Sequence, residues 1–261
     1  MKDPKKYLLQ TPTFTQDIFG SIDRFDEIES WLKDNEFHYL GKTGKVEYYD
    51  FGRAEPITGF DIPVLIKNGD KSNLIIIVGE SPLRKGSEPK FLVGFPFAVD
   101  YEEEPYQCKV YKELFNRLLE KDYNLYITDI IKLWNKSKSK NLNVTPEDKE
   151  VLNGELTILS RMYEKIHILL MGSNAQKWEV PEKVENCEIT KIEIPHMSQR
   201  NWHTWKIKIY EETFMRLIKE NKITQKNIEG LLNDTNEPEF RSMDAETVAD
   251  TAFKMISSEL N

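Results

Sequence analysis

Four short apolar segments stand in the middle of the chain, and polar residues follow each of them directly. Residues 74–78 (LIIIV) form an unbroken apolar run, rich in β-branched residues, which is typical of a strand buried on both faces. The same reasoning predicts strands over residues 124–131 and 167–171, and a more alternating strand over residues 188–194. These four segments are the predicted strands of one sheet.

Helical segments are predicted between and after these strands. Apolar residues at helical spacing predict helices over residues 106–121 and 205–221. A further helix is predicted over residues 145–165, where Thr145 can serve as N-cap and Pro146 as the first helical residue. Strands that alternate with helices pair in parallel through crossover connections. We therefore expect an α/β fold: three α/β/α layers around a mainly parallel four-stranded central sheet.

Two further segments flank this α/β domain, which is expected to span residues 71–225. Residues 1–70 are predicted to form an N-terminal appendage of helical and hairpin character. Residues 226–261 form an acidic tail that is expected to be partly helical. Both additions are candidate surfaces for a protein partner.

The composition narrows the class of protein. With 261 residues, 39% of them hydrophobic, the chain can form one substantial α/β domain and is not globally disordered. No stretch approaches the roughly 18 consecutive apolar residues of a membrane span, so no membrane partner is expected. Cys108 and Cys187 cannot build a disulfide framework or a four-thiolate metal site. We expect a reduced, soluble, cytoplasmic protein.

The charge distribution leaves room for a limited contact with DNA. A net charge of −8 argues against a protein that coats nucleic acid through bulk attraction. Residues 132–140 (KLWNKSKSK), however, carry four lysines and no acidic residue. This run is compatible with a local basic edge that grips a few phosphates, and equally with a solvated loop.

Polar residues follow the predicted strands at the ends where an open α/β sheet binds its ligands. They are Glu80, Asp129, Ser173, Asn174 and His196. A carboxylate such as Glu80 can orient a water as general base and can stabilise an oxocarbenium-like sugar. A neutral imidazole such as His196 can stabilise negative charge on a departing base. The alternatives are a capping or ion-paired glutamate and a polar loop histidine.

The order of the motifs resembles the uracil-DNA glycosylase superfamily over residues 73–209. The segments GESP…FLVGFPF, YITDIIKLW, TPED, LLMGSNA and IPHMSQRN follow one another as in that superfamily's iron–sulfur-containing bacterial and archaeal branch. HMSQRN also resembles the H-P-S-P-R-N motif of the single-strand-selective branch. The resemblance implies DNA repair by base flipping, with hydrolysis of the N-glycosidic bond of uracil or a modified base.

Further residues acquire candidate roles from this resemblance. A flipped base needs a flat apolar face, for which Phe91 is the first candidate and Phe95 the second, although aromatic residues beside a sheet also serve as plain core. The expected DNA contacts come from hydroxyl, guanidinium, amide and ammonium donors. These donors belong to Ser81, Lys132, Ser198, Arg200 and Asn201. No motif places a lysine as a Schiff-base nucleophile, so a monofunctional enzyme is expected.

Three positions depart from the superfamily's pattern. The four cluster cysteines are missing, one of them near Leu152, so no iron–sulfur cluster, other metal or cofactor is expected. Met197 stands in place of the motif's proline. Asp129 stands in place of the asparagine that reads uracil, and an ionised carboxylate offers only acceptors. A base with an exocyclic amino group, such as a cytosine or adenine derivative, therefore suits Asp129 better than uracil does.

Two other interpretations of Asp129 stay open. Burial can raise its pKa until the protonated acid donates as an amide would. Alternatively Asp129 points away, and Asn135 or a backbone amide reads the base. Two other classes of function stay open as well: an inactive module that binds DNA or a protein partner, and an enzyme that releases a base from free nucleosides or nucleotides.

Overall fold

A computed structural model describes thirteen ranges of the chain: residues 14–15, 57–61, 63–68, 72–80, 92–94, 96–98, 106–135, 143–184, 187–197, 204–205, 208, 218–220 and 245–260. The chain divides into two compact units. Unit 1 comprises Met1–Glu102 and Leu119–Glu193, and unit 2 comprises Glu103–Leu118 and Ile194–Asn261.

The main sheet contains all four predicted strands and has the order β1-β3-β6-β4-β8-β10-β9. Its centre consists of β6 (Asn124–Asp129), β4 (Asn73–Gly79) and β8 (Lys165–Met171), and β4 pairs in parallel with both neighbours. Next to β8 lies β10 (Cys187–Ile194), which pairs antiparallel with the edge strand β9 (Lys183–Val184). The prediction of a mixed α/β fold around a largely parallel sheet is confirmed, but within the described residues this sheet has seven strands where the sequence predicts four.

The N-terminal segment corrects the predicted domain boundary at residue 70. Strand β3 (Val64–Ile66) pairs antiparallel with β6, and β1 (Phe14–Thr15) pairs with β3. Strand β2 (Ile57–Asp61) lies between β5 (Leu92–Gly94) and β7 (Leu133–Asn135) in a separate three-stranded sheet. Residues before position 70 therefore extend the main sheet, because the side of β6 that faces away from β4 offers backbone groups that β3 satisfies.

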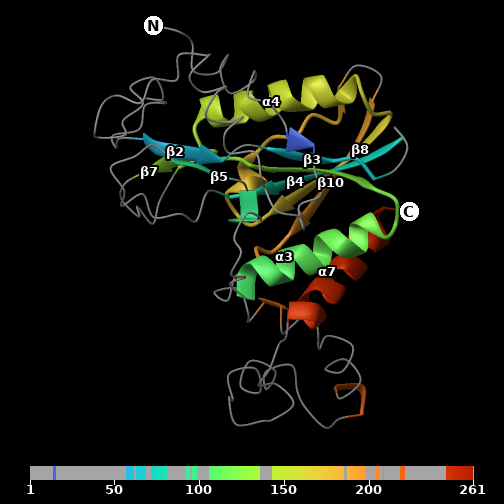
Figure 1. Cartoon of the computed structure of the whole chain (residues 1–261). Coiled ribbons are helices and arrows are strands. Elements are labelled where there is room, and N and C mark those ends of the chain that lie inside the picture. The colour runs from blue at the N-terminus through green and yellow to red at the C-terminus, as the bar shows by residue number, and fades with distance from the viewer. Residues whose placement is uncertain are drawn as a thin grey trace, which may run out of the picture. The chain divides into compact units, whose positions relative to one another are not determined.

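The core of unit 1 forms where β4 meets the helix α4 (Pro146–Ser160), which lies along one face of the sheet (Figure 1). The apolar run of β4 is buried, and its alternate residues Leu74, Ile76 and Val78 belong to one cluster with residues of α4. Each buried aliphatic side chain of this size stabilises the fold by about 1.5–3 kcal/mol relative to exposure. The α4 members of the cluster are Leu152, Leu156 and Leu159.

Helix α4 begins as the sequence predicts. Asp148 donates its backbone N–H to Thr145 Oγ1 at 3.3 Å, and its side-chain Oδ2 accepts from the backbone N–H of Thr145 at 2.8 Å. This reciprocal capping box satisfies donors that the first helical turn leaves open. The helix ends at Ser160, earlier than the predicted residue 165, because Lys165 is already the first residue of β8.

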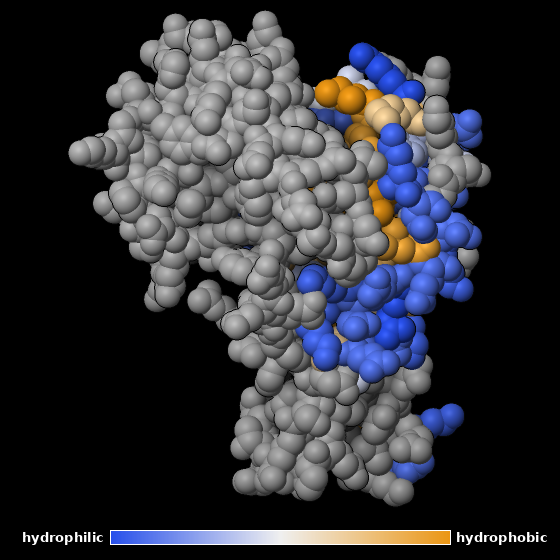
Figure 2. Space-filling model, in the orientation of Figure 1, coloured by the Kyte–Doolittle hydropathy of each residue, from blue (hydrophilic) through white to orange (hydrophobic). Residues whose placement is uncertain are grey.

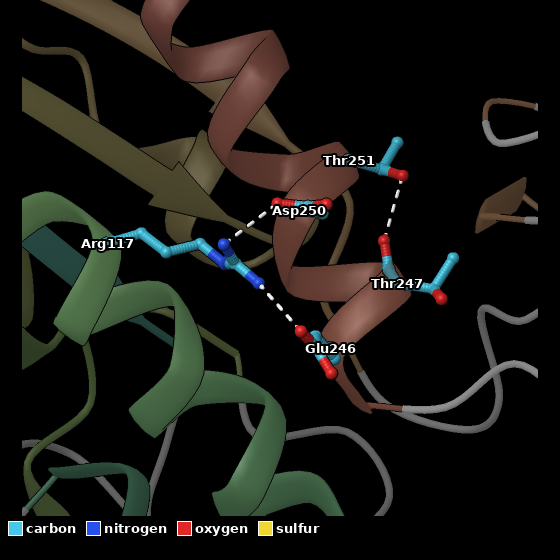
Figure 3. A network of polar contacts seen from close by, with 5 residues as sticks. All are labelled: Arg117, Glu246, Thr247, Asp250 and Thr251. Carbon is cyan, nitrogen blue, oxygen red and sulfur yellow. Dashed lines mark hydrogen bonds and ion pairs between the residues drawn. The ribbon is translucent and has the colours of Figure 1, made fainter.

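In unit 2, α3 (Tyr106–Leu119) and α7 (Ala245–Glu259) are joined by ion pairs (Figure 3). Arg117 lies 2.9 Å from Asp250 and 3.8 Å from Glu246. Both acids are exposed to solvent, so each pair stabilises the contact by less than about 1 kcal/mol. Helix α7 confirms the helical part of the predicted tail. Most of the predicted helix over residues 205–221 lies outside the described residues.

The shorter helical turns are η2 (Pro96–Ala98) and η3 (Ala175–Lys177). On the face shown in Figure 2, the described residues are mostly hydrophilic, with a narrow apolar strip among them. Two large hydrophobic side chains of the described ranges are exposed, Ile158 and Met162. None of the helices in these ranges is long and apolar enough to cross a bilayer.

His167 makes the stability of the fold depend on pH. It lies on β8 with 2% of its surface exposed, and the ring of Tyr123 meets it edge-on at 6.2 Å. Within the described part of the chain, its Nδ1 atom has no hydrogen-bond partner. Burial, and to a lesser extent the charge of Lys165, lowers the pKa of His167 to about 4.

We expect the free energy of unfolding to fall as the pH drops from about 6.5 toward 4. The folded protein keeps His167 neutral down to about pH 4, whereas in the unfolded chain the imidazole takes up a proton near its ordinary pKa of about 6.5. The free energy of unfolding is therefore at its full value above pH 6.5. About 3 kcal/mol of it is lost as the pH falls toward 4. Urea unfolding of the wild type and of His167→Leu at pH 7 and pH 4.5 measures this. An identical loss in both proteins would contradict the assignment.

Candidate functional site

Glu80 lies at the carboxyl end of β4, and the neighbouring strand β8 supplies the groups that hold it. Its Oε1 atom accepts a hydrogen bond from the backbone N–H of Asn174 at 3.1 Å, and the hydroxyl of Ser173 lies 3.5 Å away. Ser173 and Asn174 follow β8 after one glycine, Gly172. The structure therefore brings together three residues that the sequence places at this edge of the sheet, with the carboxylate half-buried.

Backbone hydrogen bonds continue the pairing of β4 and β6 beyond the strands. Gly79 accepts from the N–H of Ile130 at 3.0 Å, and Glu80 accepts from the N–H of Ile131 at 3.2 Å. In the register of the two strands, Gly79 lies opposite Asp129. Glu80 and Asp129 are thereby fixed at the ends of adjacent strands. Neither strand can slide past the other without breaking these backbone hydrogen bonds.

Because Gly79 has no side chain, the side chains of Asp129 and Phe97 can lie against its backbone. A Cβ atom at this position would collide with Oδ1 of Asp129 and would come within 2.9 Å of the ring of Phe97. The backbone of Phe97 is in the left-handed region, with φ of 58°, which is uncommon for a residue of this size. Strained backbone of this kind is concentrated at functional sites.

The aromatic residue beside Asp129 is thus Phe97, which the sequence did not single out. Phe91 and Phe95, the two candidates for stacking on a base, lie outside the described residues. Phe97 belongs to the same FLVGFPF segment, and it is partly exposed. No sequence signal separates the three phenylalanines, because the choice depends on how the segment crosses the end of β4.

The structure corrects the expected DNA contact of Lys132. Its side chain is 3% exposed, and its ammonium lies 3.2 Å from Oε1 of Glu155 and donates to the backbone carbonyl of Asp129 at 2.8 Å. An ammonium with these partners in the interior is not available to a phosphate. Lys132 instead holds the turn that carries Asp129.

Glu155 is the residue of this site that the sequence did not reveal. It lies on the buried face of α4, and the hydroxyl of Thr128 donates to its carboxylate at 3.3 Å. Burial raises the pKa of Glu155, while the charge of Lys132 acts in the opposite direction. A carboxylate between Leu152 and Leu156 on an otherwise apolar helix face is the signal that predicts a buried cation opposite it.

His196 lies in unit 2, just after β10, and is half-buried. The hydroxyl of Tyr111 lies 3.1 Å from its Nε2 atom and 3.4 Å from Nδ1. Trp205 donates its indole N–H to the backbone carbonyl of His196 at 3.3 Å. Met197, which replaces the motif's proline, is buried. The predicted DNA contacts that lie outside the described residues are Ser81, Ser198, Arg200 and Asn201.

Two observations on the described residues bear on metal binding. No group of three or more His, Cys, Asp or Glu side chains gathers among them. Burial raises the pKa of the Cys187 thiol, so the thiolate that binds metals is disfavoured there. The chemistry available at the carboxyl end of the sheet is that of a held carboxylate, a second acidic side chain and an aromatic ring.

No family model matches the chain, and no curated protein is similar to it. The backbone N–H of Asn174 orients the Glu80 carboxylate through a hydrogen bond. Such a group can take a proton from water or face a developing positive charge.

We expect Lys132→Met to lower the free energy of unfolding by about 3–5 kcal/mol, because Glu155 then stays in the interior without its cation. The double variant Lys132→Met with Glu155→Leu is expected to recover most of this loss, since no charge remains buried. Urea unfolding of the wild type, both single variants and the double variant measures the coupling.

The matched control is Lys149→Met, which removes an exposed ion pair with Glu179 at 3.4 Å. Its expected cost is below about 1 kcal/mol. If Lys132→Met costs no more than this control, the buried pair does not stabilise the turn.

Proposed function

We propose that the protein is a monofunctional DNA glycosylase that hydrolyses the N-glycosidic bond of an extruded nucleotide. The observation that carries this proposal is the Glu80 carboxylate, held by the Asn174 N–H at 3.1 Å, one residue after Gly79, against which the side chains of Asp129 and Phe97 lie. Open α/β sheets bind their ligands at this edge. The ordered motifs of the chain support the same function, and the proposal includes the three-layer α/β/α arrangement of that superfamily.

The reaction requires a water molecule and no cofactor. Glu80 orients the water, whose oxygen bonds to C1′ of the sugar while the bond between C1′ and the base nitrogen breaks. The electron pair of that bond leaves with the base, and the proton from water passes through Glu80 to the departing base. The carboxylate also faces the positive charge that builds on the sugar in the transition state. His196 is proposed to donate a hydrogen bond to the leaving base.

Recognition of the base is assigned to Asp129 and an aromatic face. An extruded base is read through hydrogen bonds to its edge and through stacking. Phe97, which lies beside Gly79, joins Phe91 and Phe95 as a candidate for the stacking face. Contacts with the DNA backbone are proposed for Ser81, Ser198, Arg200 and Asn201. Lys132 is not proposed to contact DNA, because its side chain is buried.

Glu80→Gln tests the catalytic carboxylate. We expect the variant to release a base at a rate about 10²–10⁴-fold below that of the wild type, because the amide cannot accept a proton from water. The assay is a panel of oligonucleotides with different target bases, each treated with enzyme and then with alkali to cut abasic sites. Glu179→Gln, at an exposed position far along the chain, is the matched control and should cleave as the wild type does.

The same panel separates the other classes of function. Binding of an oligonucleotide without base release indicates an inactive binding module. Base release from free nucleosides at rates comparable with oligonucleotides indicates a small-molecule enzyme. Cleavage by Glu80→Gln at the wild-type rate would refute the site.

Asp129→Asn tests the choice of base. An ionised Asp129 accepts from N3–H of uracil but faces the O4 carbonyl with like charge, and a mismatched buried pair costs on the order of 1–3 kcal/mol. We expect the asparagine variant to excise uracil roughly tenfold to a hundredfold faster near neutral pH. Asparagine has nearly the same shape, so the packing over Gly79 is kept.

The matched control is Asp122→Asn, the same chemical change at an exposed turn residue. It should leave the preference among bases unchanged. Rapid excision of uracil by the wild type at pH 8, undiminished from pH 6, would overturn the assignment of Asp129.

A further inference from the structure

Tyr111 meets His196 across the fold of unit 2. It lies on α3, 85 positions before the histidine, and its hydroxyl is closer to Nε2, at 3.1 Å, than to Nδ1, at 3.4 Å. The two rings meet at 73° with their centroids 5.9 Å apart. This arrangement directs the tip of the tyrosine toward the edge of the imidazole that carries its nitrogens.

The tyrosine is held in place independently of the histidine. Its side chain is 2% exposed, and its ring stacks on Phe115 of the same helix at 6.3 Å. The backbone of His196 is fixed from another direction by the indole N–H of Trp205, which is fully buried. A buried hydroxyl on a rigid helix therefore contacts an imidazole whose backbone is also fixed.

The direction of the hydrogen bond follows from the chemistry of the two groups. An unprotonated imidazole nitrogen is a stronger base than a phenol oxygen, and a phenol O–H is a good donor. The preferred pairing is O–H of Tyr111 donating to Nε2 of His196. A neutral ring then carries its proton on Nδ1.

We propose that Tyr111 is a positioning residue that fixes His196 as the neutral Nδ1–H tautomer. The consequence for catalysis rests on the proposed function: the donor offered to a leaving base is then Nδ1–H. Tyr111 does not itself contact the substrate in this scheme. It acts by holding one ring nitrogen as an acceptor, which leaves the other as the donor.

The test is the side-chain ¹⁵N spectrum of the full chain at neutral pH. The chain has four histidines, so their ring nitrogens can be resolved, and His196→Gln assigns the signals of residue 196. In the wild type, we expect a protonated Nδ1 and an unprotonated Nε2 at His196. In Tyr111→Phe, which keeps the ring packed on Phe115, the signals of His196 should move toward a mixture of tautomers.

Tyr163→Phe is the matched control, since it removes the hydroxyl of another buried tyrosine in unit 1. It should leave the His196 signals unchanged. A wild-type His196 that carries its proton on Nε2 overturns the proposal. Identical His196 signals in the wild type and in Tyr111→Phe overturn it as well.

Kinetics give the second readout. If the wild type releases a base, Tyr111→Phe should lower kcat by about threefold to tenfold with KM nearly unchanged, which corresponds to the loss of one neutral hydrogen bond in the transition state. If the wild type releases no base from any substrate, the proposed function fails, while the spectrum still decides the role of Tyr111. The two failures are therefore distinguishable.

Discussion

The site depends on the register between β4 and β6, which places Gly79 opposite Asp129. This pairing continues as hydrogen bonds from the Ile130 and Ile131 amides to the carbonyls of Gly79 and Glu80. A shift of β6 by one residue would turn the Asp129 side chain to the other face of the sheet. The register also explains the glycine, because a Cβ atom at position 79 would occupy the space of the Asp129 carboxylate.

A buried ion pair supports this constraint from the side of α4. Lys132 reaches back to the carbonyl of Asp129 and pairs with Glu155, whose carboxylate also accepts from Thr128. Removing two charges from water is costly, so the pair is stabilising only while both partners are present, and loss of one leaves an uncompensated charge in the interior. Here it ties the turn after β6 to the helix that covers the sheet. The turn that carries Asp129 is therefore held at a fixed position relative to α4.

Much of the fold follows from local sequence patterns. The run LIIIV predicts the buried strand β4, and Thr145 with Pro146 predicts the start of α4, because both signals depend on neighbouring residues alone. The position of Glu80 beside Ser173 and Asn174 follows from a general rule, since parallel strands end at the same edge of a sheet.

The parts that the sequence did not reveal depend on contacts between distant positions. A lysine that begins a basic run is predicted to face solvent, but Lys132 turns inward because Glu155, on another element, offers it a partner. Tyr111 is indistinguishable from other apolar-face residues of α3 until the fold brings it to His196. The short strand β3 gives a weak signal, and its place in the sheet is decided by the free edge of β6.

The most direct measurement of the central claim is the stoichiometry of the reaction on a single oligonucleotide. Mass spectrometry of one reaction mixture can quantify the free base and the remaining DNA strand together. We expect one free base for each strand that loses it, with the strand's mass lowered by the base and raised by the elements of water, and no covalent adduct with the protein. Strands that stay intact across all target bases, or strand cleavage without release of a free base, would contradict a glycosylase whose chemistry is centred on Glu80.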